Sequence, residues 1–255
     1  MTAAIASERA VFLDKDGTLL DDVPYNVDPS RIALAPGAAE GVRLLAAAGL
    51  PLVVVTNQGG VARGLFPESA LARVERRIAE LLSEVGAALA GFYYCPHDPR
   101  GSVAPFNRAC GCRKPAPGLL HDAARDLGIA LDRAWLVGDI LDDVEAGRRA
   151  GCRTILLDRG NETEWRVAPE RVPDHVAADL LGAAQIILAA ENGVRPDFPH
   201  TDGSGPSKNG VRPHFFAGGG EGFSDAHRPA KKSAPRAQVD GAKKSALTPF
   251  SEEPE

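Results

Sequence analysis

Residues 11–20 read VFLDKDGTLL, an apolar run that is followed at once by Asp14, Lys15, Asp16 and Gly17. A few apolar residues before a polar cluster and a glycine are typical of a short buried strand that ends in a turn. Taken alone, the Asp-x-Asp-Gly pattern is also compatible with a simple Asx turn in which Gly17 supplies the bend. The rest of the chain has to decide whether the two carboxylates have a chemical role.

Outward from this stretch, short apolar runs alternate with segments of helical periodicity. The strongest helical pattern covers residues 68–89, where apolar residues recur at spacings of three and four. This alternation predicts an α/β fold, a three-layer Rossmann-like parallel sheet with helices on both faces. The predicted strands are 11–14, 52–56, 92–94, 135–137 and 153–157, and the further predicted helices are 37–48, 117–127, 142–150 and 178–190.

Polar residues follow several of these strands at the end where such a sheet binds its ligands. Thr56 and Asn57 end the second strand in VVVTNQGG, and Asp139 follows the fourth in LVGDILDD. Lys114 lies in CRKPAPG, just before a proline that can open a helix. Each of these residues alone has an ordinary explanation: a turn, a solvated charge or, for Asp142, a helix cap.

Together, the same residues supply what phosphoryl transfer requires. A carboxylate at Asp14 can act as the nucleophile and form an aspartyl-phosphate, and Asp16 can protonate the leaving oxygen. Asp14 and Asp139 offer the hard oxygen ligands that Mg²⁺ prefers. Thr56 and Lys114 can neutralise the charge on the transferred phosphoryl group. The sequence therefore predicts a magnesium-dependent phosphatase.

The arrangement resembles the haloacid dehalogenase superfamily, because all four motifs of that superfamily occur in order over about residues 10–190. The resemblance implies that Asp14 is the nucleophile and that Asp16 acts first as general acid and then as general base. It implies that Thr56 and Lys114 bind the phosphoryl group. It also implies that Mg²⁺ is held by the Asp14 carboxylate, the Asp16 backbone carbonyl and Asp139.

Residues 95–115, CPHDPRGSVAPFNRACGCRKP, contain two pairs of metal-ligand residues that flank a polar loop. Three thiolates and one imidazole are suited to a closed, tetrahedral and therefore structural zinc site. The alternative is a set of buried free cysteines beside a surface histidine. We predict a zinc-stabilised loop with Cys95, His97, Cys110 and Cys112 as ligands, and we assign Cys152 to the core.

Within the superfamily, DKDGT, TNQGGVARG and CPH…CGCRKP resemble the group formed by heptose bisphosphate phosphatases and histidinol-phosphate phosphatases. The long loop between the zinc pairs and the VARG segment are similar to the heptose branch, whose substrate is D-glycero-D-manno-heptose 1,7-bisphosphate, cleaved at its 7-phosphate. By this similarity, the residues that touch the substrate are Asp22, Tyr25, Thr56, Asn57, Gln58, Gly59 and Arg113. Asp22 and Tyr25 are equally compatible with an ordinary surface loop.

One position departs from the heptose pattern. The heptose enzymes usually carry a basic residue directly after the motif-four aspartate, and this chain has Ile140 there. The phosphatase chemistry does not depend on that cation, but the choice of sugar phosphate does. No large cap domain is expected, because a helix and the zinc loop account for the gaps between the motifs.

The composition indicates a domain with a large hydrophobic core, followed by a Gly/Pro-rich segment. The 255 residues are 44% hydrophobic and carry a net charge of −5, so no attraction to nucleic acid or to anionic membranes is expected. No apolar run is long enough to span a bilayer and no signal peptide is evident, which predicts a cytoplasmic protein. We predict a monomer with a phosphatase domain over 1–194 and a disordered Gly/Pro-rich tail over 195–255.

Three other functions remain to be weighed against a heptose bisphosphate phosphatase. A histidinol-phosphate phosphatase, or a phosphatase for another sugar phosphate, would use the same residues. A nucleic-acid 3′-phosphatase would use the same chemistry, and two lysine pairs in the tail hint at it, but the acidic body argues against a basic track. A non-catalytic binding protein on this fold would be expected to lack Asp14 or Asp16, and both are present.

Overall fold

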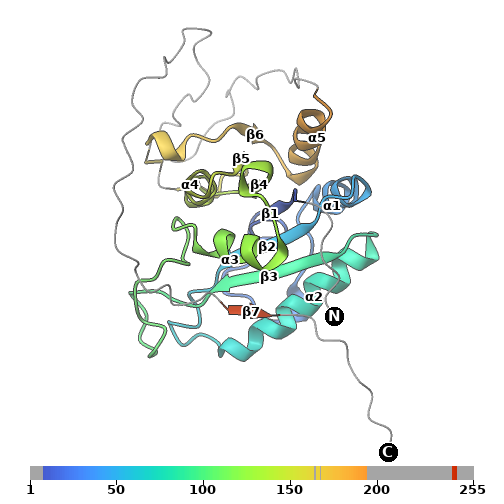
Figure 1. Cartoon of the computed structure of the whole chain (residues 1–255). Helices are drawn as coiled ribbons and strands as arrows, with labels where there is room; N and C mark the ends of the chain where they lie inside the picture. Colours follow the sequence, from blue (N-terminus) through green and yellow to red (C-terminus); the bar gives the residue numbers. More distant parts are fainter. Residues whose placement is uncertain (1–7, 164, 167, 194–242, 246–255) are drawn as a thin grey trace, which may run out of the picture.

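The computed structural model describes residues 8–163, 165–166, 168–193 and 243–245. In these residues a single sheet runs in the order β6-β5-β4-β1-β2-β3-β7 (Figure 1). Its strands are β1 (Val11–Leu13), β2 (Leu52–Asn57), β3 (Leu89–Cys95), β4 (Trp135–Gly138), β5 (Arg153–Leu157), β6 (His175–Ala177) and β7 (Lys243–Ser245). Strands β1 to β6 are parallel, and β7 pairs antiparallel with β3.

Helices cover both faces of the sheet. They are α1 (Ala38–Ala47), α2 (Leu71–Glu84), α3 (Gly118–Leu127), α4 (Leu141–Ala150) and α5 (Leu180–Glu191). Helices α1, α2 and α5 lie on one face and α3 and α4 on the other (Figure 1). The predicted three-layer α/β fold is therefore confirmed.

The core is divided by the sheet because successive strand residues point to opposite faces. Val11 and Leu13 of β1 are buried in the cluster that includes α1, α2 and α5. Phe12, between them, is buried in the cluster with α3. A strand apolar on both faces is typical of a central parallel strand. Cys152 is buried in the second cluster, as predicted, and it is not one of the residues that could hold a metal ion.

Both boundaries of the longest predicted helix were wrong, and two strands, β6 and β7, were not predicted. The helix predicted over 68–89 is a 3₁₀ turn at Glu68–Ala70 followed by α2, which ends at Glu84 because Gly86 adopts a left-handed φ of 78°. Residues from Leu89 onward belong to β3. Strand β6 was missed because His175–Ala177 is only three residues long and has no continuous apolar run.

The order of the strands explains where a site can form. Strand β1 lies between β2 and β4, and the chain connects these three strands through segments on opposite faces. Ligand sites in open α/β sheets lie beyond the carboxyl ends of the strands at such a switch point. In the part of the chain that is described, the connections are single helices and loops, and no separate cap domain is present. None of the described helices has both the length and the apolar character needed to span a bilayer.

The predicted tail, 195–255, lies outside the described residues except for β7. The strand β7 extends the sheet beyond β3, with Tyr94 opposite Lys243 and Phe92 opposite Ser245. The boundary at residue 194 stays a prediction.

Candidate active site at the carboxyl edge of the sheet

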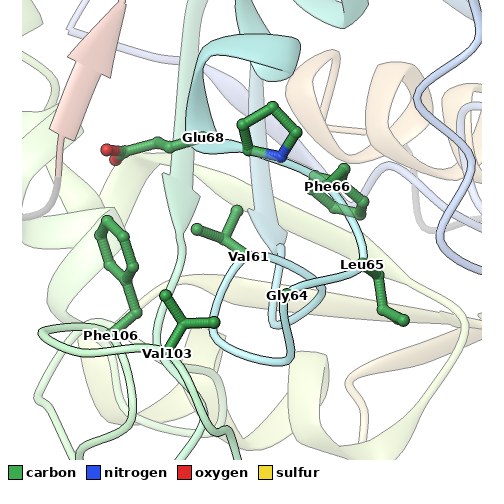
Figure 2. A pocket seen from close by; sticks show the side chains of 8 residues that line it. Val61, Gly64, Leu65, Phe66, Glu68, Val103 and Phe106 are labelled. Atoms are coloured by element: carbon green, nitrogen blue, oxygen red, sulfur yellow. The ribbon is translucent and has the colours of Figure 1, made fainter.

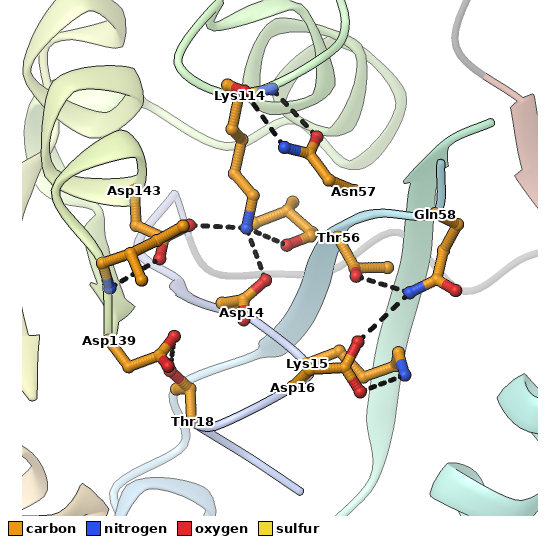
Figure 3. A network of polar contacts seen from close by, with 12 residues as sticks. Asp14, Lys15, Asp16, Thr18, Thr56, Asn57, Gln58, Lys114, Asp139 and Asp143 are labelled. Atoms are coloured by element: carbon orange, nitrogen blue, oxygen red, sulfur yellow. Dashed lines mark hydrogen bonds and ion pairs between the residues drawn. The ribbon is translucent and has the colours of Figure 1, made fainter. Parts of the chain in front are cut away.

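Four of the predicted site residues meet where β1, β2 and β4 end. Asp14 directly follows β1, Thr56 lies near the end of β2, and Asp139 directly follows β4. Lys114 enters from the loop before α3, and its side chain reaches the same point (Figure 3). All four residues are buried. The structure thus brings together residues that are far apart in the sequence.

Lys114 is the centre of a buried ion cluster. Its Nζ lies 2.5 Å from Asp14 Oδ1 and 2.6 Å from Asp143 Oδ1, and it donates to the Val55 carbonyl at 3.0 Å (Figure 3). The side chain is only 3% exposed. Burial alone would lower the pKa of Lys114, but the carboxylates of Asp14 and Asp143 outweigh it and raise the pKa. The two carboxylates therefore favour the charged ammonium form of Lys114.

The carboxylates outnumber the cations in this cluster. Burial, and then the charges of Asp14 and Asp143, raise the pKa of Asp139 to about 8. Burial likewise raises the pKa of Asp143 to about 6, against the opposing charge of Lys114. Ligand oxygens of Asp14, Asp139 and Asp143 all lie within 4.8 Å of one another. A buried site with excess negative charge and hard oxygen donors fits a divalent cation such as Mg²⁺.

Two donors fix the orientation of Asp139. The Thr18 hydroxyl donates to Oδ1 at 3.3 Å, and the Asn161 amide, from the loop after β5, donates to Oδ2 at 2.7 Å. Gly17 lets the chain pass beside them, because it has a φ of 79° and a Cβ there would lie 2.1 Å from Asp139 Oδ2. Outer partners of this kind hold metal-binding carboxylates in place.

Asp16 points away from Asp139. Its carboxylate lies 2.5 Å from the Nζ of the buried Lys15 and 3.4 Å from the Gln58 amide (Figure 3). Burial raises the pKa of Asp16, while Lys15 opposes that shift. A raised pKa favours the protonated form that a general acid requires. The Asp16 carboxylate contacts Lys15 and Gln58. This is consistent with the prediction that Asp16 binds the metal through its backbone carbonyl.

The turn after β2 supports the site from the other side. The Gln58 amide donates to the Thr56 hydroxyl at 2.9 Å. The Asn57 side chain forms two 3.0 Å hydrogen bonds with the backbone of Lys114, one to its carbonyl and one from its N–H. Asn57 therefore positions the Lys114 loop, and its predicted contact with a substrate is untested. Gly59 leaves room for Arg113, because a Cβ there would lie 3.1 Å from Arg113 Nη1.

The remaining predicted substrate contacts lie farther out. Asp22 and Tyr25 are exposed in the loop after β1. Asp22 lies close enough for its charge to contribute to the raised pKa of Asp16. Arg113 is partly buried and donates to the His97 carbonyl at 3.2 Å.

The four predicted zinc ligands form a compact cluster. The Sγ atom of Cys112 lies 3.3 Å from those of Cys95 and Cys110 and 3.4 Å from Nδ1 of His97. Tetrahedral Zn–S bonds place two sulfurs about 3.8 Å apart, so the cluster is close to a zinc geometry. None of the four cysteines is in a disulfide. Hydrogen bonds among the three thiols lower the pKa of Cys110 and raise the pKa of Cys95 and Cys112.

Some residues of the ion cluster around Lys114 and Asp139 were not predicted from the sequence. Asp143 is the most important, because its carboxylate is 1% exposed and pairs with Lys114. The sequence did offer a signal for Asp143: it lies four residues after Asp139, in the first turn of α4. Thr18 and Asn161 had no such signal. The predicted alternative that Asp142 caps α4 was wrong, because Ile140 is the N-cap and its N–H donates to Asp143.

A hollow lies between the segment after β2 and the loop over residues 95–115. Figure 2 shows Val61, Leu65 and Phe66 on one side and Val103 and Phe106 on the other. The hollow has a volume of about 440 Å³, and its lining is mostly apolar. It belongs to the contact through which the zinc loop packs onto the β2 turn.

The family model described as HAD-hydrolase-like matches residues 111–183. A D-glycero-beta-D-manno-heptose-1,7-bisphosphate 7-phosphatase from Escherichia coli K12 is 40% identical over 183 residues, which is 71% of this chain and 94% of that protein. The enzyme of the same name from Yersinia pestis is 39% identical over 153 residues, which is 60% of this chain and 81% of that protein.

Solved structures of phosphatases are also similar to this chain. A putative HAD-like phosphatase from Mesorhizobium loti has a TM-score of 0.63 and 37% identity, and the match covers 74% of this chain and 89% of that one. A D,D-heptose 1,7-bisphosphate phosphatase from B. bronchiseptica, complexed with magnesium and phosphate, has a TM-score of 0.59 and 30% identity. That match covers 71% of this chain and 99% of the other.

Proposed function

The chain belongs to the HAD-like phosphatases, and from that premise we propose that it removes the 7-phosphate of D-glycero-D-manno-heptose 1,7-bisphosphate. The observation that carries the chemistry is the buried cluster in which Lys114 lies 2.5 Å from Asp14, with Asp139 and Asp143 beside it. The observation that supports the sugar is the 40% identity to a heptose bisphosphate phosphatase over almost its whole length. The anomer is left open.

In the proposed first step, the Asp14 carboxylate attacks the phosphorus of the substrate. The bond from phosphorus to the sugar oxygen breaks, and Asp16 gives its proton to that oxygen, which leaves as an alcohol. The product on the protein is an aspartyl-phosphate at Asp14. The Lys114 ammonium and the Thr56 hydroxyl stabilise the negative charge on the remaining phosphoryl oxygens.

In the second step, Asp16, now a carboxylate, takes a proton from water. The water oxygen attacks phosphorus, the bond to Asp14 breaks, and inorganic phosphate is released with both aspartates restored. Asp14, the Asp16 carbonyl and Asp139 would hold Mg²⁺, which when bound supplies positive charge for the transferred phosphoryl group. Asp143 keeps Lys114 in place and adds negative charge to the metal site.

We assign the remaining predicted residues to the sugar and its second phosphate, and the zinc cluster to structure. Asp22, Tyr25, the turn Thr56–Gly59 and Arg113 would contact the substrate outside the reacting phosphate. Zinc at Cys95, His97, Cys110 and Cys112 would fix the loop that carries Arg113 and Lys114. We further propose that the protein acts as a cytoplasmic monomer without nucleic-acid or membrane partners, since its net charge of −5 offers no general attraction to either.

The first test is a substrate panel with purified, magnesium-replete protein. We expect kcat/KM for D-glycero-D-manno-heptose 1,7-bisphosphate to exceed that for histidinol phosphate and for simple hexose phosphates. A preference for histidinol phosphate would support the alternative function, and indifference across the panel would reject the heptose assignment. In both cases the phosphatase assignment would stand.

Ile140→Lys is expected to lower KM for the heptose substrate about fivefold and to leave kcat unchanged. Position 140 is partly exposed at the edge of the site, and heptose enzymes usually carry a cation there. One partly solvated charge contact is worth about 1 kcal/mol, and a contact equal in ground and transition states changes KM alone. Steady-state kinetics of both proteins on the panel measure this change.

The matched control is Ile140→Gln, which has a polar side chain of similar length without the charge. If Ile140→Lys does nothing for the heptose and weakens hydrolysis of a different phosphate ester, Ile140 reflects another substrate. The same lowering of KM in Ile140→Gln would show that charge is not the cause.

Truncation after Asn192 is expected to leave kcat/KM within about twofold and to lower Tm by only a few degrees. We propose that residues 1–194 form the complete catalytic unit, and β7 adds only three paired residues at the sheet edge. Truncation after Ser245, which keeps β7, is the control. A large loss in the first protein but not in the second would mean that residues up to Ser245 are needed for the fold or the site.

A further inference from the structure

Arg63 connects two segments that flank the proposed substrate-binding side of the site. It lies in the loop after β2, and its Nη1 donates to the Tyr25 hydroxyl at 2.6 Å. The guanidinium also sits over the Tyr25 ring, 5.6 Å from its centroid. On the opposite side, Arg63 Nε and Nη2 lie 2.8 and 2.7 Å from Asp98 Oδ2. No role for Arg63 follows from the proposed chemistry.

Asp98 is a fixed anchor for this contact. It directly follows the zinc ligand His97, and its side chain is 1% exposed. The other carboxylate oxygen accepts the Arg100 backbone N–H at 3.0 Å. A buried carboxylate is stable only with donors that compensate for its lost hydration, and Arg63 supplies a charged one at Oδ2.

The backbone around Arg63 is fixed to the same loop. The Ala62 carbonyl accepts N–H groups of Ser102 and Val103, both at 2.9 Å. Gly101 packs so closely that a Cβ there would lie 2.4 Å from the Ala62 oxygen. The zinc loop and the segment after β2 thus form one unit, from which the Arg63 side chain extends to Tyr25.

Tyr25 has an unfavourable backbone conformation that side-chain contacts have to stabilise. It has a φ of 55°, in the left-handed region that a bulky residue rarely adopts. Its ring lies over Gly60, where a Cβ would be 3.1 Å from Tyr25 Cδ1. The side chain is 48% exposed, so burial does little to hold it. Besides the backbone hydrogen bonds of the turn, the contact with Arg63 and the packing near Gly60 hold the Tyr25 side chain in place.

We infer that Arg63 is a positioning residue that holds Tyr25 against the zinc-loop unit, so that the loop carrying Asp22 and Tyr25 is ordered before the sugar binds. The inference rests on the proposed function, in which that loop contacts the sugar bisphosphate. Arg63 touches neither the reacting phosphate nor the metal ligands. Its loss should therefore weaken recognition of the sugar much more than the chemical steps at Asp14.

The test is Arg63→Met, which keeps the length of the side chain and removes its donors and charge. We expect KM for D-glycero-D-manno-heptose 1,7-bisphosphate to rise about fivefold with kcat within about twofold. The ratio of kcat/KM for this substrate to that for p-nitrophenyl phosphate, which has no sugar, should fall about fivefold. The control is Arg77→Met on α2, where Arg77 pairs with Glu80 and Glu84 on the surface, and all these values should stay unchanged.

A double-mutant cycle identifies the partner. Tyr25→Phe removes only the hydroxyl that accepts from Arg63, and the double variant Arg63→Met with Tyr25→Phe should be no worse than Arg63→Met alone. In addition, hydrogen exchange of the backbone amides in residues 21–27 should be faster in Arg63→Met than in the wild type or Arg77→Met. This second measurement does not depend on any substrate.

The outcomes separate the two proposals. Failure of wild-type protein to prefer the heptose bisphosphate rejects the proposed substrate, and the exchange rates then still decide whether Arg63 orders the loop. Additive effects of Arg63→Met and Tyr25→Phe, an equal loss on p-nitrophenyl phosphate, or unchanged exchange in residues 21–27 would each overturn the role of Arg63.

Discussion

Asp14→Asn is expected to reduce phosphatase turnover by at least about 10⁴-fold while the protein stays folded. The amide has the shape of the carboxylate but is a poor nucleophile, so no phosphorylated protein forms. Folding should be little affected, because Lys114 keeps its 2.6 Å contact with Asp143 and is not left as an unpaired buried charge. Turnover with saturating substrate and magnesium, together with Tm, measures both effects.

The control for Asp14→Asn is Asp132→Asn. Asp132 is exposed and precedes β4, at the amino end of the sheet and far from the site, so its replacement should change neither turnover nor Tm. Acid-quenched intact mass should detect a phosphorylated form of the wild type and none of the Asp14 variant. Turnover above about 1% of wild type, in a sample that mass spectrometry shows to be free of deamidation back to Asp, would contradict a nucleophilic Asp14.

The strand-end residues could be predicted because their positions follow from chain order alone. An apolar run that ends in Asp14, Thr56 or Asp139 specifies which end of the sheet each residue reaches. Parallel strands then bring those ends together without further information. The predicted zinc ligands could be grouped for a different reason, because their spacing is local in the sequence. Both groups of residues are adjacent in the structure as expected.

What could not be predicted were the contacts that depend on loop conformation. Asn57 uses its amide on the backbone of Lys114, 57 residues away, and Asn161 reaches Asp139 from a loop after β5. No periodicity or composition signals such contacts, since each depends on where two irregular segments cross. The pairing of Arg63 with Tyr25 and Asp98 is of the same kind.

The end of α2 shows a different limit. Apolar residues continue at helical spacing from Leu82 through Val85 to Leu89, so the pattern extended the helix to residue 89. Gly86 in a left-handed conformation ends the helix, and Leu89 begins β3 instead. Short apolar runs are compatible with either structure, and the glycine was the deciding signal.

The four predicted zinc ligands lead to the second large effect, because a metal bound there would hold the loop in which Cys112, Arg113 and Lys114 follow one another. We expect about one zinc per chain in freshly purified, reduced protein, from the set of four ligands. The zinc should remain when magnesium, which is needed for turnover, is removed by dialysis. Elemental analysis that finds no zinc would reject the zinc hypothesis.

Cys110→Ser is expected to lose zinc and to lower the free energy of unfolding by about 3 kcal/mol, which is about 10 °C in Tm for a domain of this size. Turnover should fall even at temperatures where the variant is folded. Without the metal the loop no longer fixes Arg113, and Lys114 keeps only its bonds to Asn57, Asp14, Asp143 and Val55. The matched control is Cys152→Ala, which removes a buried thiol that is not one of the four predicted zinc ligands and should cost only about 1 kcal/mol with zinc and turnover retained. Equal zinc content and equal Tm in Cys110→Ser and the wild type would show that the cysteines are core residues and that the loop is ordered without a metal.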